Sequence, residues 1–148
     1  MQITKLYMVV ILLIGSVLVG TCSNRLMKTD ATPYGVDDNL IKLVPKIDGS
    51  EWDLLVLGAK VPVVVEFEHN GHCPECDTMH PVLDKLASEF PGKVKFYRVS
   101  DCEIAKLYGI FSKCPVTAVF NDGDITNDGF IGVVSKDKLE QTIHKYLF

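Results

Sequence analysis

Two cysteines three positions apart, Cys73 and Cys76, are the residues of this 148-residue chain whose type and spacing most directly predict chemistry. Apolar residues recur at helical spacing after them, so we expect the pair at the start of a helix. There they can close a small disulfide, and free backbone N–H groups and the helix dipole stabilise the reactive thiolate. Helical geometry turns Cys76 further inward, where it can attack a mixed disulfide formed on Cys73. Half of a zinc site is the alternative that this spacing leaves open.

Three neighbours of the pair are expected to tune its redox properties. Pro74 falls where its missing N–H costs little. His72, when protonated, favours the Cys73 thiolate, whereas Glu75 stabilises the thiol. Either side chain could instead face solvent on an exposed loop.

Strand-like and helix-like segments alternate around this motif. The β-branched run at 61–67 predicts a central strand covered on both faces, and it contains Glu66. Strands are expected at residues 40–44, 61–67, 94–99, 116–120 and 125–134. Helices are expected from a cap at Ser50, from Cys73 to Phe90 with Pro81 inside, over 101–108, and after a cap at Ser135.

Several separate motifs resemble the thioredoxin family over roughly residues 40 to 147. The matching segments are Val63–Phe67, His72–Cys76, Pro81, Tyr108–Ile110 with Pro115–Thr117, Phe120–Asp124, and Gly132 with Ser135 and Lys136. The family's usual Trp-Cys-Gly-Pro-Cys is changed here at His72, Pro74 and Glu75, which bears on redox potential and partner choice. The resemblance implies an α/β, thioredoxin-like fold, with a central mixed five-stranded sheet flanked by helices.

The resemblance also implies roles for individual residues. Cys73 would be the nucleophile and Cys76 the resolving thiol. Glu66 would be a buried carboxyl with a raised pKa that takes the proton of Cys76, the alternative being a solvated glutamate at the margin of the sheet. Pro115 would be cis, and the backbone of Cys114 would pair with an extended substrate segment.

Cys102 and Cys114 allow three arrangements. They could be two separate buried or half-buried thiols, a structural disulfide, or part of a thiol relay in which Cys114 exchanges with the Cys73–Cys76 disulfide. We favour a redox role for Cys114, because its position follows from the family's loop before the proline.

The apolar N-terminal run indicates a targeting segment. We expect residues 1–21 to form a signal peptide or membrane anchor, residues 22–39 a polar tether, and residues 40–148 the thioredoxin-like domain. Cys22 follows a run that resembles a bacterial lipoprotein cleavage box and would be its lipidation site. These features predict an extracytoplasmic, membrane-tethered protein, or a secreted or periplasmic one if the chain is cleaved without lipidation.

Charge composition bears on the class of partner that the chain binds. Fifteen basic against nineteen acidic residues give a net charge of −4, so nothing suggests a nucleic-acid partner. We predict a monomeric thiol–disulfide oxidoreductase without a cofactor, which exchanges electrons with protein thiols and disulfides and with an upstream redox partner. Two alternatives remain. One is a metal or iron–sulfur module using Cys73, Cys76, Cys102 and Cys114, and the other is a non-catalytic binding module.

Overall fold

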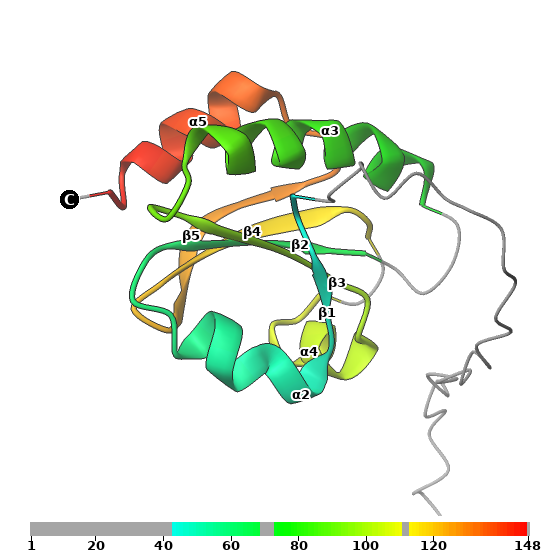
Figure 1. The fold of residues 1–148 in the computed structure, drawn as a ribbon. Coiled ribbons are helices and arrows are strands. Elements are labelled where there is room, and N and C mark those ends of the chain that lie inside the picture. The colour runs from blue at the N-terminus through cyan, green and yellow to red at the C-terminus, as the bar shows by residue number, and fades with distance from the viewer. Residues whose placement is uncertain (1–42, 69–72, 111–112, 148) are drawn as a thin grey trace, which may run out of the picture. The chain divides into compact units, whose positions relative to one another are not determined.

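The computed structural model describes residues 43–68, 73–110 and 113–147. They form a five-stranded sheet with helices on both faces (Figure 1). In chain order the elements are β1 (Lys46–Ile47), α2 (Gly49–Trp52) continued by the π-helical turn η1 (Asp53–Leu57), β2 (Val63–Phe67), α3 (Pro74–Glu89), β3 (Lys95–Val99), α4 (Cys102–Leu107), β4 (Val116–Asn121), β5 (Asp124–Ile131) and α5 (Lys136–His144). Cys22, His72 and the predicted segments 1–21 and 22–39 lie outside the described residues.

The sheet is mixed, with strand order β1-β3-β2-β4-β5. Strand β3 runs parallel to β1 and β2, whereas β4 runs antiparallel to β2 and β5. β2 is therefore the central strand, as its unbroken apolar run predicts, and all five of its residues are buried. The predicted mixed five-stranded sheet flanked by helices is confirmed.

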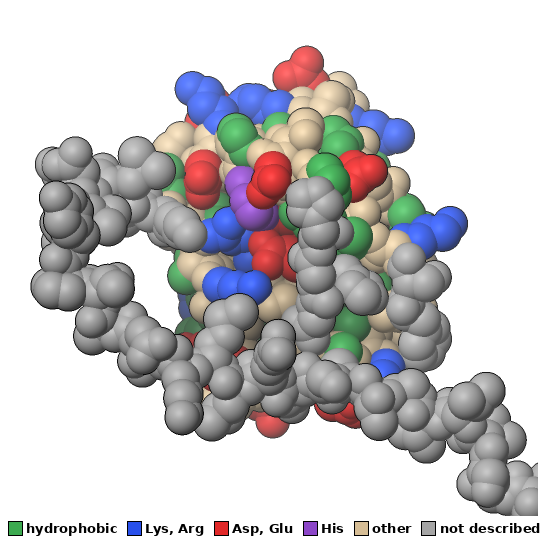
Figure 2. Space-filling view, turned by 90° about the vertical axis from the view of Figure 1, so that its right-hand side faces the viewer, with side chains coloured by type: hydrophobic (Ala, Val, Ile, Leu, Met, Phe, Trp, Pro, Cys, Tyr) green, Lys and Arg blue, Asp and Glu red, His purple; other side chains and the backbone are tan. Residues whose placement is uncertain are grey.

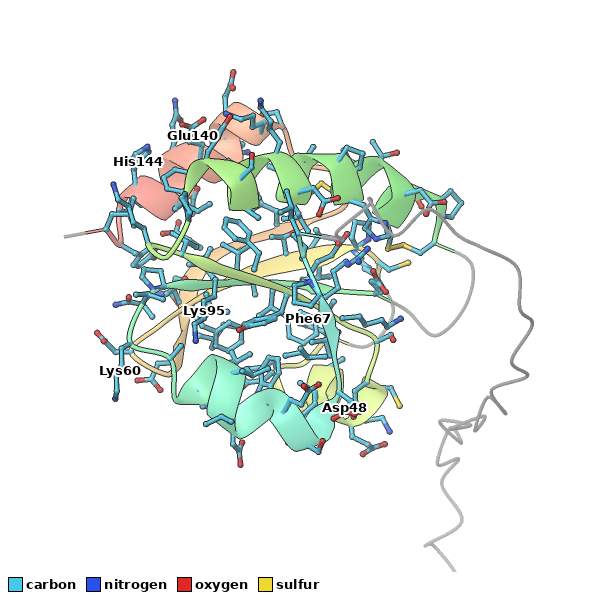
Figure 3. The ribbon with its side chains drawn as sticks, viewed as in Figure 1. Asp48, Lys60, Phe67, Lys95, Glu140 and His144 are labelled. Carbon is cyan, nitrogen blue, oxygen red and sulfur yellow. A yellow bond between two sulfur atoms is a disulfide. The ribbon has the colours of Figure 1, made fainter. Side chains whose placement is uncertain are left out.

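Two apolar cores form because side chains alternate between the faces of each strand. Helices α3 and α5 cover one face, and α2, η1 and α4 cover the other (Figure 1). The α3-side core contains Val44, Val64, Met79, Leu83, Leu86, Phe90, Val94, Phe96, Val119, Val134, Leu139 and Ile143. The opposite core contains Ile47, Trp52, Val56, Ala59, Val63, Val65, Phe67, Tyr97, Val99, Ile104, Ala118 and Phe120. Phe67 lies below the sheet in Figure 3, in the second of these cores.

Two local predictions are corrected. The first strand lies at Lys46–Ile47 rather than 40–44; the described residues 43–45 are not strand, and 40–42 lie outside the description. Pro45 has no N–H to donate to the neighbouring strand, so regular pairing with β3 begins after it. The first helix is capped by Asp48 rather than Ser50, because Asp48 and Glu51 form a reciprocal capping box.

None of the helices within 43–68, 73–110 and 113–147 has the length and apolar character that a bilayer-spanning helix requires.

Candidate active site

A disulfide joins Cys73 and Cys76 at the N-terminus of α3, with a Cα–Cα distance of 5.3 Å. Cys73 is the N-cap residue and Pro74 begins the helix, where a proline's fixed φ is favourable. The Cys76 N–H donates to the Cys73 carbonyl at 3.0 Å, which closes the first turn. The sequence therefore placed the pair correctly, at a helix end whose dipole favours negative charge.

The two cysteines differ in accessibility. Cys73 is 9% exposed, whereas Cys76, in the first turn of α3, is 3% exposed. This order matches an outer sulfur that meets a partner and an inner sulfur that does not.

A third sulfur lies beside the disulfide. Cys114 carries a free thiol and is partly exposed, and the sulfur atoms of Cys73, Cys76 and Cys114 lie within 4.8 Å of one another. No disulfide joins Cys102 to Cys114, because Cys102 begins α4 in the layer on the opposite side of the sheet from α3. Among the described residues Cys102 is not part of this sulfur group, so the four-cysteine metal site is not assembled.

The loop before β4 carries Pro115, and the Cys114–Pro115 peptide bond is cis, as the resemblance implies. The Pro115 carbonyl accepts a hydrogen bond from the Gly132 N–H at 2.8 Å, which ties this loop to the end of β5. Gly132 has φ +82°, a conformation that a side chain would disfavour. The flanking Ile131 and Val133 are exposed, so an apolar rim adjoins the loop.

Glu66 is fully buried on β2. Because Val64 of the same strand packs in the α3-side core, period-two alternation places Glu66 on that face as well. Burial raises the pKa of Glu66 from its ordinary value of 4.5 to about 8; the Glu68 charge adds to the rise, and the Arg98 charge opposes it. The buried position excludes the alternative of a solvated glutamate at the margin of the sheet.

His80 and Glu68, which the sequence analysis does not predict as site residues, lie beside Glu66. The His80 Nε2 atom lies 2.9 Å from Glu68 Oε1 and 3.7 Å from Glu66 Oε2, and Lys46 Nζ lies 3.1 Å from Glu68 Oε2. Figure 2 shows histidine, acidic and basic side chains gathered on this face of the molecule. Burial alone would raise the pKa of Glu68, but hydrogen bonds from Lys46 and His80 lower it below its usual range. The available signal was spacing, since His80 follows Cys76 by one helical turn.

Of the three predicted tuning residues, the structure describes two. Pro74 and Glu75 are exposed on the first turn of α3. Their effect on the Cys73 thiolate stays a prediction.

Comparison with known proteins identifies relatives of this chain. The family model described as "Thioredoxin" matches residues 43–145. The chain is 41% identical over 107 residues to thioredoxin M4, chloroplastic, of Arabidopsis thaliana, covering 70% of this chain and 54% of the relative. It is 36% identical over 107 residues to thioredoxin M-type, chloroplastic, of Pisum sativum, covering 70% and 60% of the two chains. It is also 38% identical over 112 residues to thioredoxin M5, chloroplastic, of Oryza sativa subsp. japonica, covering 74% and 63%. These matches confirm the thioredoxin-like fold.

The comparisons correct the predicted location. This chain spans a little over half to just under two thirds of the length of these relatives, and all three are chloroplast proteins. That finding contradicts the extracytoplasmic, membrane-tethered location predicted from residues 1–22. An apolar N-terminal run measures hydrophobicity alone, and hydrophobicity does not by itself specify a compartment.

Proposed function

Because the chain belongs to the thioredoxin family, we propose that it is a thiol–disulfide oxidoreductase acting on protein substrates through Cys73 and Cys76. The observation that carries the proposal is the disulfide at the N-terminus of α3, with a partly exposed free thiol beside it. Electrons move by thiol exchange, so the reaction needs no organic cofactor. The residues needed lie within one chain, which supports action as a monomer.

In the reduced protein, the Cys73 thiolate attacks a substrate disulfide. A Cys73–substrate disulfide forms, the substrate S–S bond breaks, and one substrate thiolate leaves. Cys76 then loses its proton and attacks the Cys73 sulfur, which restores the Cys73–Cys76 disulfide and releases the second substrate thiolate. Two electrons pass to the substrate, and an upstream redox partner supplies them again. The greater exposure of Cys73 supports its role as the attacking sulfur.

Glu66 accepts the Cys76 proton in this scheme. Its burial on the α3 side of β2 and its pKa of about 8 support the role, because a proton acceptor works best when its pKa is near the working pH.

Substrate binds at the Cys114–Pro115 loop as an added extended segment. Backbone hydrogen bonds to Cys114 would supply affinity with little sequence preference. The exposed Ile131 and Val133 beside this loop favour partners that present an apolar patch next to their disulfide. His72, Pro74 and Glu75 adjust the reduction potential through the charge and hydrogen bonding around Cys73.

Reduction of insulin disulfides tests the function. Wild type should accelerate insulin reduction by dithiothreitol, and Cys73→Ser should abolish the acceleration because the attacking sulfur is gone. His144→Gln is the control, since its side chain is 56% exposed on α5, far from the N-terminal end of α3, and the substitution leaves the dithiol unchanged. Wild type that is inert in several redox buffers would leave a non-catalytic binding module as the better assignment.

A further inference from the structure

A row of polar side chains crosses four strands beneath α3. The strand register aligns Lys46 of β1 with Arg98 of β3, Arg98 with Glu66 of β2, and Glu66 with Thr117 of β4. Since Val64, Phe96 and Val119 pack in the α3-side core, alternation places the row on that same face. Glu66, Arg98 and Thr117 are each at most 8% exposed.

Several polar atoms of this row have no hydrogen-bond partner in the protein. Within the described residues, the buried side-chain atoms without a hydrogen-bond partner are both Glu66 carboxyl oxygens, Arg98 Nε and Thr117 Oγ1. Arg98 donates through Nη2 to the Val44 carbonyl at 2.9 Å, which holds its guanidinium beside the row. Buried polar groups normally find partners, and those that do not are often functional. Glu66 can therefore gain or lose a proton without breaking a hydrogen bond to the protein.

His80 links Glu66 to the surface. One nitrogen, Nε2, reaches both the buried Glu66 oxygen at 3.7 Å and the Glu68 oxygen at 2.9 Å. Side-chain exposure rises along this series, from 0% at Glu66 to 13% at Glu68 and 27% at His80. A proton on Glu66 is thus one side chain away from groups that contact solvent.

Glu66, Glu68 and His80 could alternatively bind a metal ion, because their ligand atoms lie within 4.8 Å of one another. Charge argues against it. Lys46 forms an ion pair with Glu68, and Arg98 faces Glu66, so two cations already balance the two carboxylates. A divalent ion would bring excess positive charge into a buried site.

We propose that His80 is the proton shuttle between Glu66 and solvent, and that it removes the Glu66 proton so that the Glu66 carboxylate can take the Cys76 proton while the mixed disulfide is resolved. The proposal rests on the oxidoreductase function proposed above. The His80 imidazolium first gives its Nε2 proton to water through the Glu68 carboxylate. The freed Nε2 then accepts the Glu66 proton, which restores the imidazolium and leaves a Glu66 carboxylate that takes the Cys76 proton. One proton has gone to water, and the departing substrate thiolate takes one from solvent. His80 acts through Glu66 and does not touch the sulfur atoms in this scheme.

Charged side chains from the elements that pack around Glu66 and His80 surround this path. They are Lys46 from β1, Glu68 after β2, Arg98 from β3, and His80 and Asp84 from α3, and β4 contributes the uncharged Thr117.

The test compares two substitutions of His80. His80→Gln retains a group that can donate to Glu68 but cannot carry a proton, and His80→Ala opens a solvent-facing space. Rapid acid quench with mass spectrometry would measure the lifetime of the Cys73–insulin mixed disulfide in a single turnover. Both variants should lengthen that lifetime by about tenfold, and added imidazole should restore the rate of His80→Ala but not of His80→Gln.

His144→Gln is the matched control. His144 lies on α5, far from the N-terminal end of α3 (Figure 3), and its side chain is 56% exposed. This variant should resolve the mixed disulfide at the wild-type rate. Glu66→Gln should also be slow, and adding His80→Gln to it should slow it no further, because the two residues serve one path.

The outcomes separate the two proposals. An inactive wild type would overturn the oxidoreductase function itself. An active wild type with a normal His80→Gln lifetime, or a slow His80→Ala that imidazole does not rescue, would overturn the shuttle alone. Far-ultraviolet circular dichroism and thermal unfolding of each variant would establish that it is folded.

Discussion

Cys114 is the residue that most changes the chemistry open to the disulfide. A thiol within 4.8 Å of both disulfide sulfurs can attack either of them by intramolecular exchange, with no added oxidant. The bond to one partner forms as the Cys73–Cys76 bond breaks, and the displaced cysteine leaves as a thiolate. The site therefore holds a nucleophile of its own in addition to the resolving Cys76.

Cys76→Ser exposes this capacity. Without its usual partner, Cys73 should form a disulfide with Cys114 when the protein is treated with oxidised glutathione, because their sulfurs are already adjacent. Thiol mapping by mass spectrometry would detect the bridge. The double variant Cys76→Ser, Cys114→Ser should instead retain glutathione on Cys73. Alkylation of Cys114 in every state, together with full activity of Cys114→Ser, would make Cys114 a packing residue.

Among the elements, the turn of the β4–β5 hairpin packs closely against the end of η1. Asp122 has φ 53° and Gly123 has φ 84°, which is the pair of positive φ values that a tight two-residue hairpin turn requires. A Cβ at Gly123 would stand 2.6 Å from the Leu57 carbonyl oxygen at the end of η1. The turn thus fixes the hairpin against the segment that leads into β2.

Gly123→Ala should destabilise the fold more than Gly92→Ala. Both glycines have positive φ, so both substitutions cost about 1 kcal/mol of backbone strain. A Cβ at Gly92 meets nothing within 4 Å, whereas one at Gly123 displaces backbone, so we expect Gly123→Ala to cost at least about twice as much. Urea unfolding of both variants measures the difference. Equal losses would show that the turn tolerates the contact with η1.

At the scale of the whole molecule, Glu66 makes stability depend on pH. Its pKa is about 8 in the folded protein, against an ordinary value of 4.5, because burial disfavours the charged form. Between these values the unfolded chain has released the proton that the folded protein still holds. Stability contributed by this group is complete below about pH 4.5 and is lost as pH rises to about 8.

Glu66→Gln removes this dependence, since the amide is neutral at every pH. The variant should gain stability relative to wild type as pH rises, by up to about 5 kcal/mol once Glu66 is ionised. Urea unfolding of the oxidised proteins at about pH 5 and about pH 9 provides the comparison, and oxidation prevents the dithiol from titrating. Glu75→Gln, on the exposed side of α3, should show no such growth. A constant difference between Glu66→Gln and wild type would mean that Glu66 ionises as readily in the folded protein as in the unfolded chain.

Local features could be predicted from the sequence because local physics determines them. Apolar periodicity predicted the order of strands and helices, and the β-branched run predicted the central strand. The spacing of Cys73 and Cys76 predicted a disulfide at the start of a helix. The predicted start of the first helix was wrong because two neighbouring residues can cap it, and Asp48 does so instead of Ser50.

The polar side chains beneath α3 could not be assigned to one site from the sequence. Lys46, Arg98, Glu66 and Thr117 are far apart in the sequence, and strand register alone aligns them in one buried row. Register depends on which strands pair, and residues close in sequence do not determine that pairing. The resemblance already implied that Cys114 lies near the dithiol, because its loop precedes Pro115. Cys102 does not lie there because it begins α4, on the other side of the sheet from α3. Residue types and local spacing thus identify the reactive side chains of this chain, whereas the packing of distant segments brings particular ones together in one site.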